Sequence, residues 1–324
     1  MPGIKPGMTV ENAVTARIID GKAIAAELRG KVAGEVKRLT AQHGVTPGLA
    51  VVLAGNNPAS ESYVGSKAKA TKEAGMQSFD YRLPDGVGQA ELMALVKKLN
   101  ADPAVHGILV QLPLPPQIDA QQVLDAIDPM KDVDGFHPVN AGRLQSGQPG
   151  LQPCTPAGII EILKRSNLPI SGQNAVVIGR SDIVGKPVAL LLINESATVT
   201  VCHSKTRDLP AVTRNADILV AAIGRPGYVT PEMVRPGAIL IDVGINRLTD
   251  SSDVQRFFAG DAERAAAFAK RGSVIVGDID PAAFAISRAY TPVPGGVGAL
   301  TIAMLMHNTV KAARLRRGIA TESR

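Results

Sequence analysis

The stretch from Val176 to Pro187 has the residue types of a phosphate-binding turn. It reads V-V-I-G-R-S-D-I-V-G-K-P, in which an apolar run ends at Gly179 and a second glycine, Gly185, opens a helical pattern. This order predicts the strand, turn and helix of a βαβ unit, whose turn amides and helix N-terminus can hold a phosphate. The spacing G-x-S-x-x-x-G departs from the common G-x-G-x-x-G, so its sequence neighbours must support the assignment.

The residues after the next apolar run indicate which dinucleotide this turn would bind. In NAD-specific folds the second strand usually ends in Asp or Glu, which accepts a hydrogen bond from the ribose 2′-OH. Here no carboxylate occurs before Asp208, and the residues that follow the run are His203, Ser204, Lys205, Thr206 and Arg207. Hydroxyls and cations, with Arg180 as a further cation, suit a 2′-phosphate, so we predict NADP rather than NAD. The alternative is that Lys205 and Arg207 belong to a solvated turn.

Further candidates for chemistry lie near the ends of expected strands, where open parallel sheets bind ligands. Tyr63 and Lys67 are four residues apart in a helical stretch and therefore share one face. Gln111 ends the apolar run G-I-L-V-Q. Asp132 and Asp134 alternate in the loop K-D-V-D-G-F-H-P, so their side chains should point the same way. Singly, each has an ordinary explanation, since most helical lysines are solvated and an Asp before Gly is commonly a turn residue.

The elements that must position these residues follow an α/β pattern. The chain has 324 residues, 45% hydrophobic and 3% aromatic, which indicates one large or two ordinary domains with aliphatic cores. Gly/Pro-rich passages at Pro113–Pro116 and Gly142–Pro153 separate two α/β halves. Strands are expected at 49–53, 78–82, 107–111, 175–178, 198–202, 218–222, 238–243 and 274–276. Helices are expected at 19–40, 59–74, 89–100, from a Thr155–Pro156 cap through 164, and at 299–317, the last crossing back to the first domain.

Other features limit the function classes. The formal charge is +6, but no basic stripe with interleaved aromatics indicates nucleic acid, and Lys311–Arg317 is expected to be a solvated helix end. Cys154 and Cys202 lie far apart and the histidines form no metal-binding motif, so we predict neither a disulfide nor a metal site. Met1–Thr15 lacks a signal-peptide pattern and no apolar run reaches the length of a membrane span, so we expect a cytoplasmic protein without a membrane partner.

A series of motifs from Ile18 to Ala312 resembles one enzyme family. The motifs are, in order, S-Y-V-x-S-K, G-I-L-V-Q-L-P-L-P, D-V-D-G-F-H-P-V-N, P-C-T-P-x-G, V-V-I-G-R-S-x-I-V-G-K-P, D-V-G-I-N-R and T-P-V-P-G-G-V-G. On them the chain is similar to the bifunctional methylenetetrahydrofolate dehydrogenase/methenyltetrahydrofolate cyclohydrolase family, called FolD in bacteria. The resemblance implies NADP-dependent oxidation of 5,10-methylenetetrahydrofolate to the methenyl cation. Hydrolysis of that cation then gives 10-formyltetrahydrofolate, a step of one-carbon metabolism.

The resemblance also implies roles for individual residues. Lys67 would be the central catalytic group, hydrogen-bonded and positioned by Gln111. Tyr63 would stack on the aminobenzoyl ring and help to orient the lysine. Asp134 would anchor the pterin, because a carboxylate can accept two parallel hydrogen bonds from the pterin edge. The sequence allows Lys67 to act either as a base or as a cation that polarises an oxygen.

The same resemblance implies the cofactor site, the domain division and the assembly. Residues lining the NADP site would be Gly179, Arg180, Ser181, Ser204 and Ile245. A loop bordering the substrate would contain Pro292, Pro294, Gly295 and Gly296, with a plain interdomain turn as the alternative. Residues 1–153 and 291–324 would form an N-terminal α/β catalytic domain with a parallel sheet. Residues 154–290 would form a Rossmann-like NADP-binding domain, with the active-site cleft between the two, and the enzyme would be a homodimer. Cys154 and His137 are expected to be structural.

Some positions depart from the family pattern. Asp182 occupies a position where the family often has Asn, and it puts a negative charge near the expected phosphates. Ala299-Leu300 replaces the usual Pro-Met, so the last helix is expected to start differently. The stretch from Leu248 to Ser273 is longer than in the family and predicts an added amphipathic helix. Three roles are open for this helix: it covers a surface, it extends a dimer contact, or it has no part in catalysis.

Three alternatives remain open at this point. A monofunctional dehydrogenase would show little cyclohydrolase activity, although the presence of both Lys67 and Gln111 argues against it. A catalytically idle dinucleotide-binding or RNA-binding protein would use the +6 charge and would bind nucleic acid in a salt-sensitive way. An unrelated NADP dehydrogenase acting on a small acid would have no need of the loop motifs.

Overall fold

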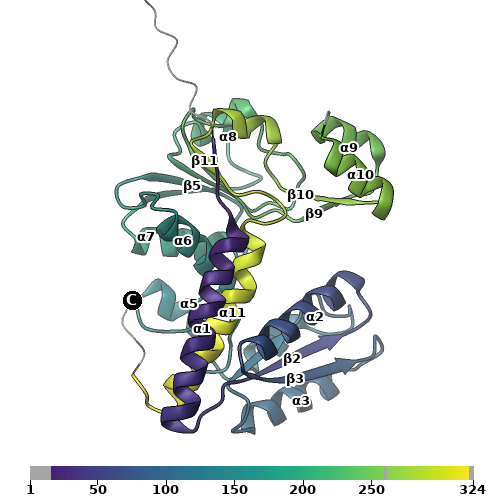
Figure 1. Ribbon diagram of the computed structural model, residues 1–324, viewed down its shortest axis with the longest axis vertical. Coiled ribbons are helices and arrows are strands. Elements are labelled where there is room, and N and C mark those ends of the chain that lie inside the picture. The colour runs from purple at the N-terminus through teal and green to yellow at the C-terminus, as the bar shows by residue number, and fades with distance from the viewer. Residues whose placement is uncertain (1–15, 259–260, 321–324) are drawn as a thin grey trace, which may run out of the picture.

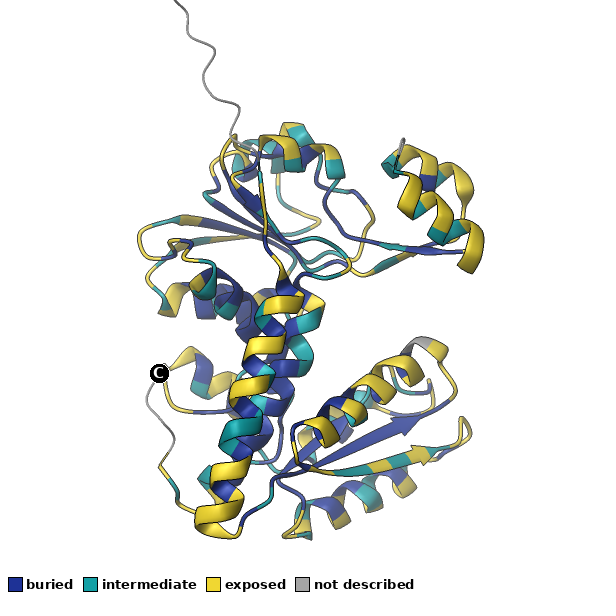
Figure 2. Cartoon of the chain, viewed as in Figure 1, coloured by how far each residue is buried: buried dark blue, intermediate teal, exposed yellow. Residues whose placement is uncertain are grey.

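Two α/β regions are joined by two long helices that lie side by side, α1 (Gly21–His43) and α11 (Val297–Arg316) (Figure 1). This computed structural model describes residues 16–258 and 261–320, so the leader Met1–Thr15 lies outside the described part. Helix α1 buries one side and exposes the other, whereas α11 is buried or half-buried along most of its length (Figure 2). No helix in the described part is long and apolar enough to cross a membrane.

The first region contains a three-stranded parallel sheet in the order β3-β2-β4. Its central strand β2 (Gly48–Ala54) is buried along its whole length, because helices cover both faces of such a sheet. Its other elements are β3 (Gln77–Leu83), β4 (Gly107–Val110), α2 (Pro58–Glu73), α3 (Gln89–Ala101), α4 (Ala120–Asp125) and α5 (Pro138–Gln145). The expected strands and the helices α1 to α3 are confirmed, whereas the short α4 and α5 were not predicted.

The second region contains a six-stranded parallel sheet in the order β1-β11-β8-β7-β5-β6. Its strands are β1 (Arg17–Ile18), β11 (Ala289–Tyr290), β8 (Ile239–Asp242), β7 (Ile218–Ala221), β5 (Asn174–Ile178) and β6 (Thr198–Cys202). Its helices include α6 (Cys154–Arg165), α7 (Gly185–Asn194) and α8 (Leu209–Thr213), with 3-10 turns at Pro231–Met233 and Pro281–Ile286. The predicted two-region α/β fold with parallel sheets is confirmed.

Two strand pairings differ from the sequence prediction. Arg17–Ile18, assigned to the first domain, pairs with β11 and so extends the second sheet. Val274–Val276, expected in that sheet as a parallel strand, is β10 and pairs antiparallel with β9 (Asn246–Leu248) in a separate hairpin. Strands of two or three residues carry no usable periodicity, so only tertiary packing determines their partners.

The long stretch between β9 and β10 forms two helices rather than the single amphipathic helix expected. They are α9 (Ser251–Phe258) and α10 (Ala262–Arg271), and we call them the inserted hairpin helices. Asp261 caps α10 by accepting the N–H of Arg264 at 3.0 Å. Figure 1 shows this pair standing beside the second region rather than within its sheet.

Three local expectations about helix ends also need correction. Helix α6 begins at Cys154, and Thr155 bonds the Thr301 hydroxyl at 3.0 Å instead of capping the helix. Helix α11 begins at Val297, before the Ala299-Leu300 departure. The basic tail of α11 is not a solvated end, because its cations reach the first region. These contacts are Lys311 to Gly150 O, Arg314 to Glu35 and Arg316 to Asp128.

Candidate active site

Lys67 is buried, and its ammonium group is held by a side chain at a neighbouring strand end. It lies on α2 with 7% of its surface exposed, and its Nζ donates a hydrogen bond of 2.9 Å to Oε1 of Gln111. Gln111 directly follows β4, and its backbone N–H donates to Val52 O of β2. The fold therefore brings together the predicted catalytic lysine and its predicted partner.

Both members of this pair have fixed positions. The Gln111 amide is oriented because Nε2 donates to Leu112 O at 2.6 Å, which leaves Oε1 facing the lysine. On α2, the Thr71 hydroxyl donates to Lys67 O at 2.8 Å and contacts Met306 Sδ of α11 at 3.5 Å. A lysine placed this firmly can act on one chosen atom of a bound substrate.

Tyr63 lies one helical turn before Lys67. It is 39% exposed, and the burial of the remainder raises the pKa of its phenol. A partly exposed ring next to a buried lysine can stack on a flat group. The hydrogen bond that fixes the lysine goes to Gln111, so the orienting role expected of Tyr63 stays a prediction.

Asp134 is the second charged group near Lys67. Burial raises the pKa of its carboxyl group, while the Lys67 cation and a hydrogen bond from the Cys154 thiol lower it. The Cys154 sulfur also lies 3.2 Å from Val133 O, and burial raises the pKa of this thiol well above its usual value. Cys154 is therefore a protonated, buried residue at the start of α6, as expected.

Asp132, two residues earlier, serves a different purpose. It is 2% exposed, and its carboxylate accepts the N–H groups of Gly135 and His137 and Nδ2 of Asn140 at 2.8–3.1 Å. His137 in turn caps α5 through Nδ1, so its expected structural role is confirmed. Asp132 thus stabilises the fold of the loop that carries Asp134. Although the two residues alternate along the chain, their carboxylates have different partners.

Asn308 on α11 supports this loop and was missed by the sequence analysis. It is 2% exposed, and Nδ2 donates at 2.8 Å to both Val133 O and Gln152 O. The residue before Asp134 is thereby tied to the helix that joins the two regions. The available signal was an amide side chain inside the otherwise apolar final helix.

The turn after β5 has the close backbone packing that its glycines predict. Gly179 has φ +125°, and a Cβ there would lie 2.2 Å from Ala222 O. A Cβ on Gly185, at the start of α7, would lie 2.3 Å from Gly179 O. Only glycine fits either position, because a side chain would force strand, turn and helix apart. The strand–turn–helix expected at Val176–Pro187 is confirmed.

Polar residues complete this turn. The Ser181 hydroxyl accepts the N–H groups of Val184 and Gly185, each at 3.2 Å, and so orders the entry to α7. The unusual Asp182 pairs with Lys186 at 2.5 Å, and its side chain is 84% exposed. Its negative charge therefore has a neighbouring cation one helical turn away.

A second turn, after β6, presents hydroxyl and cationic side chains. The His203 N–H donates to Thr206 Oγ1 at 2.9 Å, and the Lys205 N–H donates to His203 Nδ1 at 3.1 Å. These bonds close the turn and leave Ser204, Lys205 and Arg207 exposed at the carboxyl end of β6. This arrangement fits a 2′-phosphate better than a ribose hydroxyl, which requires an acceptor.

The predicted substrate loop Pro292–Gly296 meets the cofactor region at Ile245. It connects β11 to α11, and a Cβ on Gly298, just beyond it, would lie 3.7 Å from Cδ1 of Ile245. The loop also packs on the first turn of α1, where a Cβ on Gly21 would lie 2.2 Å from Gly296 O. The structure thus places a predicted cofactor residue beside a predicted substrate loop.

Two buried aspartates that the sequence analysis left without a role hold the loops around Ile245. Asp278 accepts the N–H groups of residues 223–225 and Nδ2 of Asn246 at 2.6–2.9 Å. Asp242 accepts three backbone N–H groups at 2.8–3.0 Å. Burial raises the pKa of Asp242 to about 7, although those hydrogen bonds lower it. Both aspartates occur next to glycines in the motifs D-V-G and G-D-I, which is the signal that the sequence offered.

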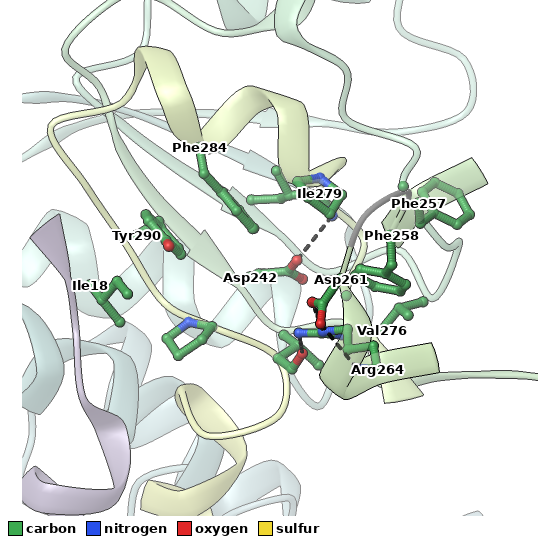
Figure 3. Close-up of a pocket in the computed structure, with 15 residues that line it drawn as sticks. Ile18, Asp242, Phe257, Phe258, Asp261, Arg264, Val276, Ile279, Phe284 and Tyr290 are labelled. Atoms are coloured by element: carbon green, nitrogen blue, oxygen red, sulfur yellow. Dashed lines mark hydrogen bonds and ion pairs between the residues drawn. The ribbon is translucent and has the colours of Figure 1, made fainter. Parts of the chain in front are cut away.

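The two cavities described for this structure lie away from Lys67. One, of about 160 Å³, is lined by Gly55–Asn57, Asp85 and Pro113–Pro115, next to the strand end that carries Gln111. The other, of about 320 Å³, lies between the inserted hairpin helices and the second region (Figure 3). Neither cavity includes Lys67, Tyr63 or Asp134, so the catalytic assignment depends on side-chain contacts and not on a cavity.

Comparison with known proteins assigns both regions to one family. Residues 19–134 match the catalytic domain of tetrahydrofolate dehydrogenase/cyclohydrolase, and residues 153–317 match its NAD(P)-binding domain. The bifunctional protein FolD of Koribacter versatilis is 61% identical over 303 residues, covering 94% of this chain and 98% of that protein. The bifunctional protein FolD of Rhodopseudomonas palustris (strain HaA2) is 57% identical over 310 residues with the same coverage.

Solved structures agree with this assignment. The bifunctional FolD enzyme of Campylobacter jejuni is 44% identical with a TM-score of 0.84, covering 93% of this chain and 99% of that one. The methylenetetrahydrofolate dehydrogenase-cyclohydrolase of Trypanosoma brucei, solved with NADP cofactor and an inhibitor, is 39% identical. It has a TM-score of 0.84 and covers 93% of this chain and 98% of that one.

Proposed function

The chain belongs to the tetrahydrofolate dehydrogenase/cyclohydrolase family, and on that premise we propose how its residues share the two reactions. It is a bifunctional FolD enzyme of one-carbon metabolism that uses NADP. It oxidises 5,10-methylenetetrahydrofolate and hydrolyses the methenyl product to 10-formyltetrahydrofolate. The observation that carries the assignment of roles is the buried hydrogen bond between Lys67 Nζ and Gln111 Oε1.

Lys67 is the proton-handling group of the hydrolysis. Addition of water to the methenyl cation breaks one C–N bond of the ring and releases one proton, so a group must take up that proton near the reacting carbon. In its neutral amine form the buried Lys67 takes up this proton, and in its cationic form it stabilises the ionised Asp134. Gln111 fixes either form by accepting one of its hydrogen bonds. Tyr63, half-exposed one turn away, stacks on the aminobenzoyl ring of the substrate.

Asp134 binds the pterin. As a carboxylate it accepts two parallel hydrogen bonds from the pterin's amino edge. The Lys67 cation and the Cys154 thiol favour its ionised form against the effect of burial. The support from Asn308 and Asp132 keeps the carboxylate at a fixed position relative to the lysine.

The cofactor is held by the turns after β5 and β6. Gly179, Arg180 and Ser181 form the phosphate turn, Ser204 faces the 2′-phosphate, and Ile245 covers the nicotinamide side. The fit is supported by the two glycine positions that no side chain could occupy and by the exposed hydroxyl and cations after β6. When bound, NADP supplies the hydride acceptor of the dehydrogenase reaction.

The chain divides into a substrate side and a cofactor side. The substrate side comprises residues up to 153 and from 291, with Pro292, Pro294, Gly295 and Gly296 bordering the substrate, and the cofactor side comprises residues 154–290. The strand β1 is the exception, because it pairs with the second sheet. The enzyme works as a cytoplasmic homodimer.

The test is a direct assay of both reactions on the purified chain. With 5,10-methylenetetrahydrofolate, absorbance should show NADPH and methenyl product forming with NADP⁺ and only poorly with NAD⁺. Methenyltetrahydrofolate supplied alone should then decay by hydrolysis faster than in buffer. Dehydrogenase activity without accelerated hydrolysis would favour the monofunctional alternative, and a folded chain inactive with both cofactors would contradict the proposal.

A further inference from the structure

The inserted hairpin helices reach the substrate loop through one side chain, Arg264 of α10. Its Nη2 donates to Val293 O at 3.0 Å, and its Nη1 donates to Ile275 O of β10 at 3.3 Å. Because the guanidinium is planar and rigid, these two bonds fix the loop carbonyl relative to the hairpin strand. Val293 lies within the loop Pro292–Gly296 that precedes α11.

Arg264 is itself held on its other sides. Its guanidinium lies 4.1 Å above the ring of Phe258 and 3.4 Å from the carboxylate of Asp261. Burial lowers the pKa of Arg264, and Asp261 opposes that change. Figure 3 shows Arg264 and Asp261 next to each other at the edge of the cavity, with Phe258 alongside. The side chain therefore has little freedom to leave the loop carbonyl.

The hairpin helices also contact the second region at Gly227, so Arg264 is not their sole attachment. A Cβ on Gly227 would lie 2.0 Å from Cε1 of Phe257, which packs directly on that glycine. Between the Phe257 contact and the Arg264 contact lies the 320 Å³ cavity, lined on the opposite side by Phe284 and Tyr290. Loss of Arg264 would therefore release the loop while Phe257 still anchors the helices.

We propose that Arg264 is a positioning residue for the folate substrate, acting through Val293 to set the loop Pro292–Gly296. The loop contains Gly295 at φ +111°, and a glycine restricts its own backbone little, so contacts with other segments select the loop geometry. The packing of Gly296 on α1 is one such contact, and the Arg264 hydrogen bond to Val293 is the other. The insert, which departs from the family pattern, thereby contributes to substrate binding without touching the substrate. This inference rests on the proposed function of the loop.

The experiment compares R264A, R264K and R256A in the full-length enzyme. Arg256 is the matched control, because it lies on α9 and stacks 5.1 Å from the Phe257 ring but is exposed and makes no contact with the loop. R264A should raise KM for 5,10-methylenetetrahydrofolate about five- to tenfold, which is less than the full effect of a lost charge-assisted hydrogen bond because Arg264 acts on the substrate only through the loop. KM for NADP⁺ and the thermal unfolding midpoint should stay near wild type. R264K keeps the charge but lacks the planar guanidinium fork that reaches both carbonyls, so its KM should lie between.

Hydrogen exchange tests whether the effect of R264A is confined to the loop. R264A should exchange faster in peptides covering residues 291–300 but not in those covering α9, and R256A should match wild type in both. An unchanged folate KM in R264A, or an equal rise in R256A, would overturn the proposal. If R264A does not fold, an R264K variant with wild-type KM would overturn it equally. Wild type without activity would instead contradict the proposed function.

Discussion

The substrate side and the cofactor side of this enzyme differ in what holds their functional groups. Lys67 and Asp134 are held by contacts between separate elements, such as the Gln111 bond at the end of β4. Arg180, Ser204 and Lys205 are exposed side chains on two short turns, each of which is closed by hydrogen bonds within the turn itself. A buried polar group that loses its partner is left unsatisfied, whereas an exposed one returns to water. Substitutions should therefore have large effects on the first side and graded effects on the second.

The largest effect is expected at Lys67. K67A removes the amine that we propose to handle the proton and should reduce kcat of the hydrolysis at least about 100-fold, the usual contribution of a general acid–base group. The measurement is the decay of methenyltetrahydrofolate absorbance, with K69A as the control, because Lys69 lies on the same helix but is exposed and pairs with Glu73. If K67A kept most of the wild-type kcat of hydrolysis, the reaction would not depend on Lys67 and its contact with Gln111.

The next effect separates the two aspartates of the loop. D134N should raise KM for the folate substrate about tenfold or more with little loss of stability, since it removes one charged acceptor. D132N leaves backbone N–H groups of the loop without a carboxylate and should lower the free energy of unfolding by about 1–3 kcal/mol. Steady-state kinetics and thermal unfolding of both variants distinguish the two roles.

The same aspartate predicts a pH dependence. Burial raises the pKa of Asp134 above 3.8, and in our proposal the ionised form binds the pterin. In wild type, KM for the folate should therefore rise as the pH falls through a midpoint above 3.8, and D134N should lack this rise. A midpoint equal to that of an exposed carboxyl would show that Asp134 is not buried in the working enzyme.

A smaller effect is expected after β6 on the cofactor side. The double variant K205A/R207A removes two exposed cations and should raise KM for NADP⁺ about five- to tenfold, since each cation near a phosphate contributes modestly in solvent. KM for NAD⁺ should not change. An equal loss with both cofactors would mean that these side chains support the turn rather than bind a 2′-phosphate.

The smallest effect is expected at Asp182. It pairs with Lys186 at the exposed surface, and such pairs contribute about 0–1 kcal/mol. D182N should therefore change KM for NADP⁺ by less than about twofold. A much lower KM for NADP⁺ in D182N would show that Asp182 repels the cofactor phosphates even though it pairs with Lys186. The effects on the cofactor side would then not be limited to small local changes.

Several parts of the molecule could be predicted from local sequence. The buried strands Gly48–Ala54 and Gly107–Val110, the glycine turn at Gly179 and the face shared by Tyr63 and Lys67 follow from short-range patterns. Each depends on residues a few positions apart, where periodicity and glycine conformation act directly. The motifs that resemble the family added the pairing of Lys67 with Gln111, which spacing alone does not show.

Other parts were decided only by tertiary structure. The two-residue strand β1 joins β11 from the far end of the chain, and β10 leaves the main sheet for β9. Asn308 and Arg264 also serve residues distant in sequence, at Val133 and Val293. These side chains look ordinary in sequence because their partners are carbonyl groups, which every residue possesses. The sequence alone indicated which groups we propose for the chemistry, whereas the packing of distant segments decided what holds them in place. The physical reason is that a hydrogen bond to a backbone carbonyl leaves no mark on the identity of the residue that accepts it.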